Sequence, residues 1–509
     1  MSGQACPGAF ALVLHSHLPW LAHHGGWPVG EEWLYQAWAG CYLPLTRVLA
    51  DLAREGHRDV LTLGVTPVLA AQLDDPYCLR GMSAWAGGWQ ARAIELATDA
   101  DPARRRAAAL EFRLASQALD DLQTRWRSGG SPVLRQLADA GVVELLGGPA
   151  THPFQPLLEP DLARLSLLAG LADARLRRGA ASGGGVWAPE CGYSPGLEQA
   201  YARCGVTHFL ADGPTLEASD RPTAGAWRVG GTDVVAFGRD LAVTDRIWSS
   251  RTGYPAGAAY RDFHEVDRRS GFRLASVTGP GVPASAKAPY DPHRAAAALE
   301  RDAHDFVDVV RARLAEVAER DGSPGLVVAA YDTELFGHWW HEGPQFLARV
   351  LRLLPAAGVR LTTLRGALDA GYVRGDVDLA AGSWGAGKDF RVWDGAPVRP
   401  LVDEAFWVQR RLLDLLDGER AAGRLTTRRP DLDQLTRQAL LALSSDWAFM
   451  VTREQAADYA WRRAAEHRVA FHRLAELAER RDPAVLAEAA RQRVADGPFA
   501  ALDVRGLIA

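Results

Sequence analysis

Short apolar runs that end in polar residues recur along the chain and define its predicted strands. Each run is rich in Val, Leu and Ala, as expected of strands buried on both faces. We therefore predict eight strands, seven of which end at a polar side chain, while the eighth is plainer. The runs are AFALVLHSH (9–17), DVLTLGVT (59–66), VVELLGGPATH (142–152), GVWAPE (185–190), THFLADG (207–213), DVVAFGRD (233–240), GLVVAAYDTE (325–334) and VRLTTL (359–364).

Amphipathic helices are predicted between most of these strands. Residues 43–56 and 160–179 place apolar side chains at helical spacing. Alternation of strands and helices indicates a parallel sheet, and polar groups at the carboxyl ends of the strands favour a β/α barrel, where working groups gather at that edge. A doubly wound open sheet is the second candidate, but no G-x-G-x-x-G loop follows the first strand.

Two segments depart from the alternation and a third ends it. Residues 86–128 contain two helical stretches between strands and are predicted to form a helical insertion. Residues 241–290 are irregular and rich in Gly, Pro, Tyr and Ser, which is typical of a functional or disordered segment. Strands vanish beyond about residue 400. We predict a catalytic domain at 1–395 and an all-α C-terminal domain at 396–509.

Composition narrows the function. The chain has 509 residues and a net charge of −5, with no basic patch for nucleic acid. No apolar run approaches the roughly 18 residues needed to span a bilayer. The five cysteines show no C-x-x-C pair, which favours a reducing compartment. The N-terminal segment lacks the charged and apolar regions of a signal peptide, so we expect a cytoplasmic protein.

Tryptophan is unusually abundant, with 17 residues against 11 Tyr and 15 Phe. Many of these tryptophans lie beside Gly, Pro or charged residues instead of within apolar runs. Flat aromatic rings stack on the apolar faces of sugars, so carbohydrate binding is one hypothesis. The alternative is that the tryptophans fill a large core.

Acidic residues follow two of the predicted strands. Glu190 ends one, and Asp332 and Glu334 end another, where period-two spacing puts these two on one face. If both strands belong to one barrel, the acids meet at its mouth. Two converging carboxylates allow a retaining glycosidic mechanism, in which one attacks and the other donates a proton. The alternative is a helix cap or a structural ion pair, and spacing alone leaves the choice between Asp332 and Glu334 open.

Histidines cluster at the same strand ends. His15 and His17 form H-x-H after the first strand, and with His152 they could bind a metal, with Asp332 as a fourth ligand. Alternatively, neutral imidazoles bind sugar hydroxyls or form a buried structural pair. The segment GHWWHEGP (337–344) adds His338 and His341 as a weak zinc pattern, and the two tryptophans between them suggest an aromatic plug or a sugar platform.

Together these motifs resemble glycoside hydrolase family 57, and within it the 1,4-α-glucan branching enzymes. The resemblance covers nearly the whole chain. It rests on H-x-H at 15–17, W-x-P-E at 187–190, YDTELFGHWW at 331–340, GEEWLYQAW at 30–38, SWGAGKDFRVW at 383–393 and SSDWAF at 444–449.

The resemblance implies a distorted (β/α)7 barrel with a helical C-terminal domain, and no metal or other cofactor. It makes Glu190 the nucleophile and Asp332 the general acid/base. The enzyme would cleave α-1,4 links of amylose, glycogen or a related glucan and form α-1,6 branches through a covalent glycosyl-enzyme, as in glycogen biosynthesis. The implied substrate-binding residues are His15, His17, Trp33, His152, Tyr254, Trp384, Trp393, Asp446 and Phe449.

The resemblance also identifies an active-site loop at about 241–265. Its segment 243–263 is similar to a loop that carries a tyrosine important for transfer, for which we choose Tyr254, with Tyr260 as the alternative. The chain departs from its relatives at Leu274 and Ala275, where aromatic residues usually stand. This departure puts the chain-length preference and the ratio of branching to hydrolysis in question.

Other functions fit parts of the pattern. An α-amylase or a 4-α-glucanotransferase would share the fold and the acids. A metal-dependent polysaccharide deacetylase also uses histidines and acids at the mouth of a related barrel, and an inactive glycan-binding protein would account for the tryptophans. The sequence does not predict an oligomeric state.

Overall fold

A computed structural model describes residues 8–26, 29–249 and 252–507. Seven strands form one continuous parallel run in the order β8-β1-β2-β3-β4-β5-β7. They match the first seven runs predicted from the sequence. The strands are β1 (Gly8–Ser16), β2 (Leu61–Val65), β3 (Val143–Gly147), β4 (Ser182–Val186), β5 (His208–Ala211), β7 (Val235–Gly238) and β8 (Gly325–Asp332).

The sheet curls into a distorted barrel. β7 and β8, the two ends of the parallel run, meet through a backbone hydrogen bond from Asp240 N to Val328 O (2.7 Å). Arg313 Nε reaches the Asp240 carboxylate across this junction, 2.8 Å away. Beyond β7 the sheet continues into β6 (Ala226–Val229), which is antiparallel to β7, and then into β10 (Val373–Val377). The fold is therefore the distorted (β/α)7 barrel that was expected.

Two strands at one end of the sheet and one short strand differ from the sequence prediction. β10, at the edge, and its neighbour β6 were not predicted, because each is brief and includes exposed residues. The plain run at 359–364 shortens to β9 (Arg360–Leu361), which pairs only with the start of β1 among the described residues. The sheet edge is thus where apolar patterning predicted least.

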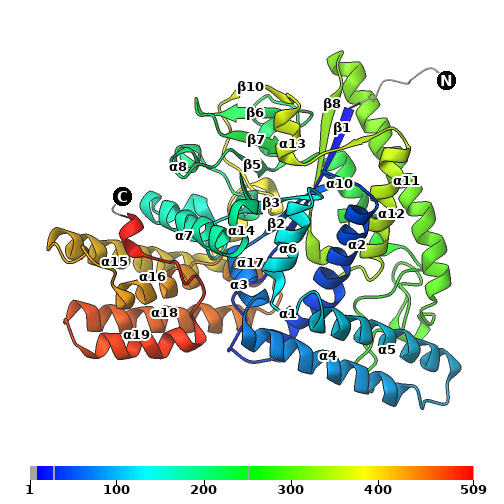
Figure 1. The fold of residues 1–509 in the computed structure, drawn as a ribbon, viewed down its shortest axis with the longest axis horizontal. Helices are drawn as coiled ribbons and strands as arrows, with labels where there is room; N and C mark the ends of the chain where they lie inside the picture. The colour runs from blue at the N-terminus through cyan, green and yellow to red at the C-terminus, as the bar shows by residue number, and fades with distance from the viewer. Residues whose placement is uncertain (1–7, 27–28, 250–251, 508–509) are drawn as a thin grey trace.

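Helices follow the strands and cover the sheet (Figure 1). The first helical segment continues directly from α1 (Glu31–Ala37) through a π-helix, η1 (Trp38–Tyr42), into α2. The remaining helices of this layer are α2 (Leu43–Arg54), α3 (Pro67–Leu73), α6 (Gly130–Asp139), α7 (Pro160–Arg178), α8 (Leu197–Arg203), α9 (Gly213–Glu217), α10 (Leu241–Trp248), α11 (Pro292–Asp321), α12 (Gly343–Ala356), α13 (Leu364–Asp369) and α14 (Arg391–Asp394).

Two long helices, α4 (Pro76–Leu96) and α5 (Pro102–Gln123), follow β2 and precede β3 along the chain, and they form an antiparallel pair (Figure 1). Each begins with an Asp that caps the helix, followed by Pro. The side chains of Asp75 and Asp101 accept hydrogen bonds from amides of the first turn. Arg104 of α5 forms a bidentate pair with Asp267, so the irregular segment after α10 is tied to these helices. The limits 86–128 for the insertion stay a prediction.

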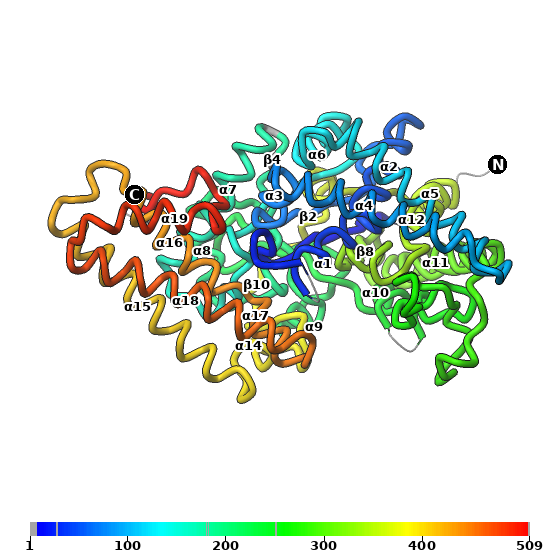
Figure 2. Tube along the Cα trace, turned by 90° about the horizontal axis from the view of Figure 1, so that it is seen from below, coloured from blue at the N-terminus to red at the C-terminus, as the bar shows by residue number. Residues whose placement is uncertain are grey.

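The C-terminal part is entirely helical in the described residues. It comprises α15 (Arg399–Ala421), α16 (Pro430–Ala442), α17 (Ser445–Thr452), α18 (Ala457–Glu479) and α19 (Ala484–Ala495). Two views place most of these helices at one end of the long axis and α4, α5, α11 and α12 at the other, with the sheet between them (Figures 1 and 2). No helix of the described residues is long and apolar enough to cross a membrane.

Candidate active site

The carboxyl ends of the parallel strands bring the predicted histidines and acids together. His15 of β1 lies directly opposite Asp332 of β8 in the strand register. The His15 ring stacks on Trp187, just after β4, with centroids 4.2 Å apart. Trp187 precedes Glu190 by three residues. Because parallel strands end at the same edge, residues far apart in sequence share one site.

Glu190 lies in a tight turn after β4. Its backbone is left-handed, with φ 60° and ψ 20°, and Cys191 follows with φ 49°. This conformation is uncommon for residues other than Gly and is typical of functional sites. The side chain is buried, and each carboxylate oxygen accepts one hydrogen bond. Trp384 Nε1 donates to Oε2 (2.8 Å) and Ser445 Oγ donates to Oε1 (2.8 Å).

A chain of hydrogen bonds leads from the histidines to Glu190. Because Ser445 Oγ gives its proton to Glu190, it accepts from His152 Nδ1, which is 2.9 Å away. The Nε2 atom of His152 is then free of hydrogen and accepts from His15 Nε2 at 3.0 Å. Burial lowers the pKa of His15 and His152 well below the ordinary value, and a charge on His17 lowers both further. Both imidazoles are therefore neutral, and every donor in the chain is directed toward Glu190.

The two predicted catalytic acids have different environments. Burial raises the pKa of Glu190 overall, and the hydrogen bonds from Trp384 and Ser445 limit that rise. Burial also raises the pKa of Asp332, to well above its usual range, and the charges of Glu334 and Glu190 raise it further against the opposing Arg239. Within the described residues, the carboxyl of Asp332 makes no side-chain hydrogen bond. The structure thus favours a protonated Asp332, whereas the charged form of Glu190 is stabilised by two hydrogen bonds that Asp332 lacks.

Glu334 is held away from this pair. Its carboxylate accepts from Tyr42 Oη and from His17 N, and burial raises its pKa to about 7. Tyr42 ends the π-helix η1, an element that often marks functional sites. Since both partners of Glu334 are protein groups, Asp332 is the acid of the DTE segment that is left to meet a ligand.

His17 links the barrel to the C-terminal helices. Its Nε2 lies 2.9 Å from Asp446 Oδ2 on α17, and its Nδ1 lies 3.0 Å from Thr66 Oγ1. Burial lowers the pKa of His17, but the charge and hydrogen bond of Asp446 outweigh it and raise the pKa overall. The donor atoms of His17, His152 and Asp446 lie within 4.8 Å of one another, close enough to hold a metal ion. His15 and Asp332, which the metal hypothesis also named as ligands, are not part of this group.

Three residues near Glu190 were not placed in the site by sequence reasoning: Trp187, Trp248 and Arg239. The ring of Trp384, which was predicted, lies 5.1 Å from Trp187 and 6.0 Å from Trp248, measured between ring centroids. The Arg239 guanidinium lies 5.4 Å from the Trp384 ring and pairs with the buried Asp212. The polar end of the sixth predicted strand was the available signal for Arg239. Trp248 lies on α10 and is 40% exposed, so a ligand can reach it.

Four predicted substrate-binding residues lie elsewhere or at the margin. Trp393 is buried and stacks on Phe154 with centroids 4.4 Å apart, so it supports the site from behind instead of lining the cleft. Tyr254 is also buried, and its hydroxyl donates to Asp305 on α11. The alternative, Tyr260, is likewise bonded to Asp302. The remaining two are Trp33, half-buried on α1, and Phe449, exposed on α17.

Comparison with known proteins matches almost the whole chain. The family model described as glycosyl hydrolase family 57 matches residues 11–379, and the model described as 1,4-alpha-glucan branching enzyme, C-terminal, matches residues 406–506. A probable 1,4-alpha-glucan branching enzyme of Mycobacterium tuberculosis is 53% identical over 99% of both chains. A 1,4-alpha-glucan branching enzyme of Thermococcus kodakarensis is 32% identical over 92% of this chain and 73% of its own length.

Solved structures give the same result. The crystal structure of a GH57-type branching enzyme from Pyrococcus horikoshii has a TM-score of 0.92 with 30% identity, covering 99% of this chain and 97% of the other. An α-amylase from Thermotoga maritima has a TM-score of 0.88 at 23% identity and shares the fold. On the breadth of these matches, the chain belongs to glycosyl hydrolase family 57.

Proposed function

We propose that this protein is a 1,4-α-glucan branching enzyme in which Glu190 is the nucleophile and Asp332 the general acid/base. The observation that carries the assignment is the contrast between the two carboxyls. Glu190 receives hydrogen bonds from Trp384 and Ser445, which favour its charged form, whereas burial and two neighbouring acids keep Asp332 protonated. The named relatives and the matching C-terminal model support branching as the activity.

The chemistry follows from these two protonation states. Glu190 attacks the anomeric carbon of an α-1,4-linked glucose while Asp332 gives its proton to the departing 4-oxygen. The bond to the leaving chain breaks as the bond to Glu190 forms. Asp332, now ionised, then takes the proton of a 6-hydroxyl on another glucan segment. That oxygen displaces Glu190 and leaves an α-1,6 branch. Such a retaining mechanism places the two carboxyl groups about 5–5.5 Å apart.

Two parts of the chain build the reactive carboxylate's surroundings. We infer a catalytic domain at 1–395, including an active-site loop at about 241–265, and an α-helical domain at 396–509. Glu190 takes one hydrogen bond from Trp384 and the other from Ser445, one from each proposed domain. His17 and Asp446 join the same two parts. Docking of the helical domain therefore completes the site.

The donor and acceptor are α-1,4-glucans such as amylose, and the product is a branched glucan of the glycogen class. His15, His17 and His152 position the sugar beside the acids, and Trp384 and Trp248 offer ring faces for stacking. We place the protein in the cytoplasm. Its described thiols, Cys41, Cys78, Cys191 and Cys204, are free, as expected in a reducing compartment, while Cys6 lies outside the described residues.

Incubation of the full-length protein with amylose tests the activity. Proton NMR is expected to show α-1,6 signals, and a debranching enzyme should then release short chains. Substituting Glu190→Gln or Asp332→Asn should reduce branching by at least about a thousandfold, because each removes a group that makes or breaks a bond. A product containing only rearranged α-1,4 chains would instead identify a 4-α-glucanotransferase, and release of reducing sugar alone would identify an amylase.

A metal-dependent deacetylase is the second candidate, favoured by the grouping of His17, His152 and Asp446. A zinc ion there would need an unprotonated nitrogen on each imidazole. Elemental analysis of the purified protein distinguishes the two functions. Stoichiometric zinc, together with chelator-sensitive release of acetate from an acetylated polysaccharide, would overturn the branching assignment.

A further inference from the structure

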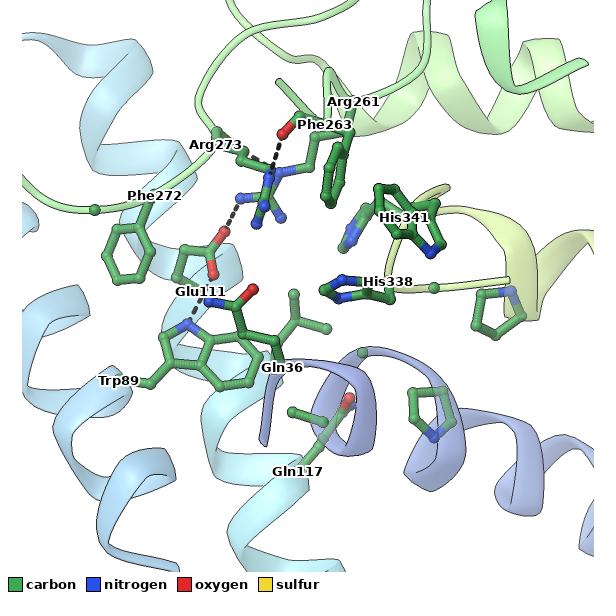
Figure 3. Close-up of a pocket in the computed structure, with 18 of the residues that line it drawn as sticks. Gln36, Trp89, Glu111, Gln117, Arg261, Phe263, Phe272, Arg273, His338 and His341 are labelled. Carbon is green, nitrogen blue, oxygen red and sulfur yellow. Dashed lines mark hydrogen bonds and ion pairs between the residues drawn. The ribbon is translucent and has the colours of Figure 1, made fainter. Parts of the chain in front are cut away.

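A second cavity lies between the α4–α5 pair and the loops around residues 261–273 and 337–345, with a volume of about 190 Å³ (Figure 3). We call it the Trp339 cavity. Neither Glu190 nor Asp332 is among the described residues that line it, nor are their hydrogen-bond partners. The residues on which its character depends are Gln36, Trp89, Gln117, Phe263, His338, Trp339 and His341.

The two tryptophans of the GHWWHEGP segment have different environments. Trp340 is buried and packs on Phe346, with ring centroids 4.9 Å apart. Trp339 is instead 41% exposed, and its ring centroid lies 4.6 Å from that of Phe263, with 42° between the ring planes. Trp89 forms part of another wall, where its Nε1 donates to the buried Glu111 (2.8 Å). The cavity therefore offers fixed aromatic faces on different elements.

Several neutral polar groups face the cavity without a partner. In the described part of the chain, neither the ring nitrogens of His338 and His341 nor the amide of Gln117 make a hydrogen bond. Figure 3 shows both imidazoles on one side, opposite Trp89 and Phe272, with Gln36 between them. Burial, together with the nearby Arg273, lowers the pKa of His338 to about 3. Neutral imidazoles and amides donate and accept hydrogen bonds, as hydroxyl groups require.

Two arginines of the wall, Arg261 and Arg273, are already satisfied by the protein. Arg261 pairs with Glu111, and its Nε donates to Arg273 O (2.7 Å). Arg273 donates to Phe263 O (2.6 Å), and its guanidinium lies 4.3 Å from the centre of the Phe263 ring. Since these cations have carbonyl, carboxylate or aromatic partners, the free groups that remain match an uncharged, polyhydroxylated ligand better than an anion.

The floor of the cavity is rigid backbone. Gly40 of η1 and Gly337 touch so closely that a Cβ added at Gly337 would lie 1.9 Å from Gly40 O. Gly337 follows Asp332 by five residues in the same loop. The segment that carries the acid therefore also forms this floor, and a chain long enough to reach from one site to the other would contact both.

We propose that the Trp339 cavity binds a segment of neutral α-glucan outside the bond-cleaving cleft, with sugar faces on Trp339 and hydroxyls on His338, His341 and Gln117. The identity of the sugar rests on the proposed function. Binding remote from the reacting bond would hold long chains to the enzyme, so the cavity selects for chain length.

Two measurements on full-length Trp339→Ala test the cavity. Calorimetric titration of maltoheptaose into Glu190→Gln, which blocks turnover, is expected to lose one binding event, or to weaken it about tenfold, when Trp339→Ala is added. In the otherwise unchanged protein, Trp339→Ala should raise KM for amylose by a similar factor and leave kcat unchanged. Trp407→Ala, which removes a 63%-exposed tryptophan of α15, is the matched control and should change neither value.

The outcomes separate this proposal from the proposed function. Branching activity with identical KM values for the Trp339→Ala and Trp407→Ala proteins would overturn the cavity assignment and leave the function intact. Absence of branching, with maltoheptaose binding that still depends on Trp339, would overturn the proposed function and leave the cavity assignment intact. Binding of glucose 1-phosphate in place of maltoheptaose would overturn the neutral ligand. If Trp339→Ala fails to fold, Gln117→Ala on the exposed face of α5 serves in its place.

Discussion

At the residue scale, the carboxylate of Glu190 is oriented by its own backbone and by two donors from distant segments. The left-handed conformations of Glu190 and Cys191 cost on the order of 1–3 kcal/mol each. The hydrogen bonds from Trp384 and Ser445 hold the side chain in the orientation that this turn provides. Local strain and long-range bonds therefore act together on one functional group.

Ser445→Ala tests the long-range part. Loss of the donor removes a bond that lowers the pKa of Glu190, so that pKa rises. Because Glu190 must be ionised to attack in the proposed mechanism, the acidic limb of the kcat/KM profile should move to higher pH. The rate at neutral pH should fall roughly 10- to 100-fold, the value of a hydrogen bond to a charged group. Ser83→Ala, on the exposed face of α4, is the control. A lower rate with an unmoved limb would mean that Ser445 is only structural.

Residues at strand ends could be predicted from the sequence because parallel topology makes their positions converge. His15, Glu190 and Asp332 each follow an apolar run, so pattern and chemistry coincide. Ser445 gave no such signal, since a serine at the start of a helix is usually read as part of its cap. Trp393 was predicted to bind substrate because tryptophan is typical of a sugar platform. Only the three-dimensional structure shows that its ring is stacked against Phe154.

At the element scale, α17 is joined to the residue that follows β1 by the partly buried pair of Asp446 and His17. Long apolar runs predicted the seven parallel strands, because such strands are buried on both faces. The strands β6 and β10, at one end of the sheet, were not predicted, because short and partly exposed segments resemble loops. The helical character of the C-terminal part was evident from periodicity, but its docking on β1 depends on tertiary contacts that periodicity does not encode.

Asp446→Asn should lower the stability of the folded protein by an amount that depends on pH, because it removes the partner of His17. Asp446 raises the pKa of His17 in the folded protein, so the stabilisation is fully present below the unfolded value of about 6.5 and is lost as pH rises through the folded value. The variant should lose about 1–3 kcal/mol at the acidic side and less at the alkaline side. Urea unfolding at several pH values measures the difference. Asp458→Asn, exposed on α18, is the control, and a pH-independent loss would contradict the argument.

At the scale of the whole molecule, the barrel is held shut at the junction of β7 and β8. Asp240 serves both sides, since its backbone amide donates to Val328 and its carboxylate accepts from Arg313 on α11. The same carboxylate caps α10 through Val243 N. Three elements thus depend on one buried acid.

Arg313→Ala should lower the free energy of unfolding by about 1–3 kcal/mol, less than for a fully buried pair because Arg313 is 20% exposed. The reason is that the buried carboxylate of Asp240 loses its cation. Arg311→Ala on the same helix removes only an exposed pair with Asp308 and is the matched control. Equal urea midpoints for the two variants would show that the junction does not depend on this pair.

The 255 residues that separate Glu190 from Ser445 also have a meaning for biosynthesis. A ribosome adds about 5–20 residues per second, so roughly 10–50 s pass between synthesis of the nucleophile and synthesis of its second donor. In the later part of that interval, after Asp332 has been added, the growing polypeptide carries both acids but lacks the serine that orients Glu190. The orientation of Glu190 is therefore complete only after translation has passed the start of α17.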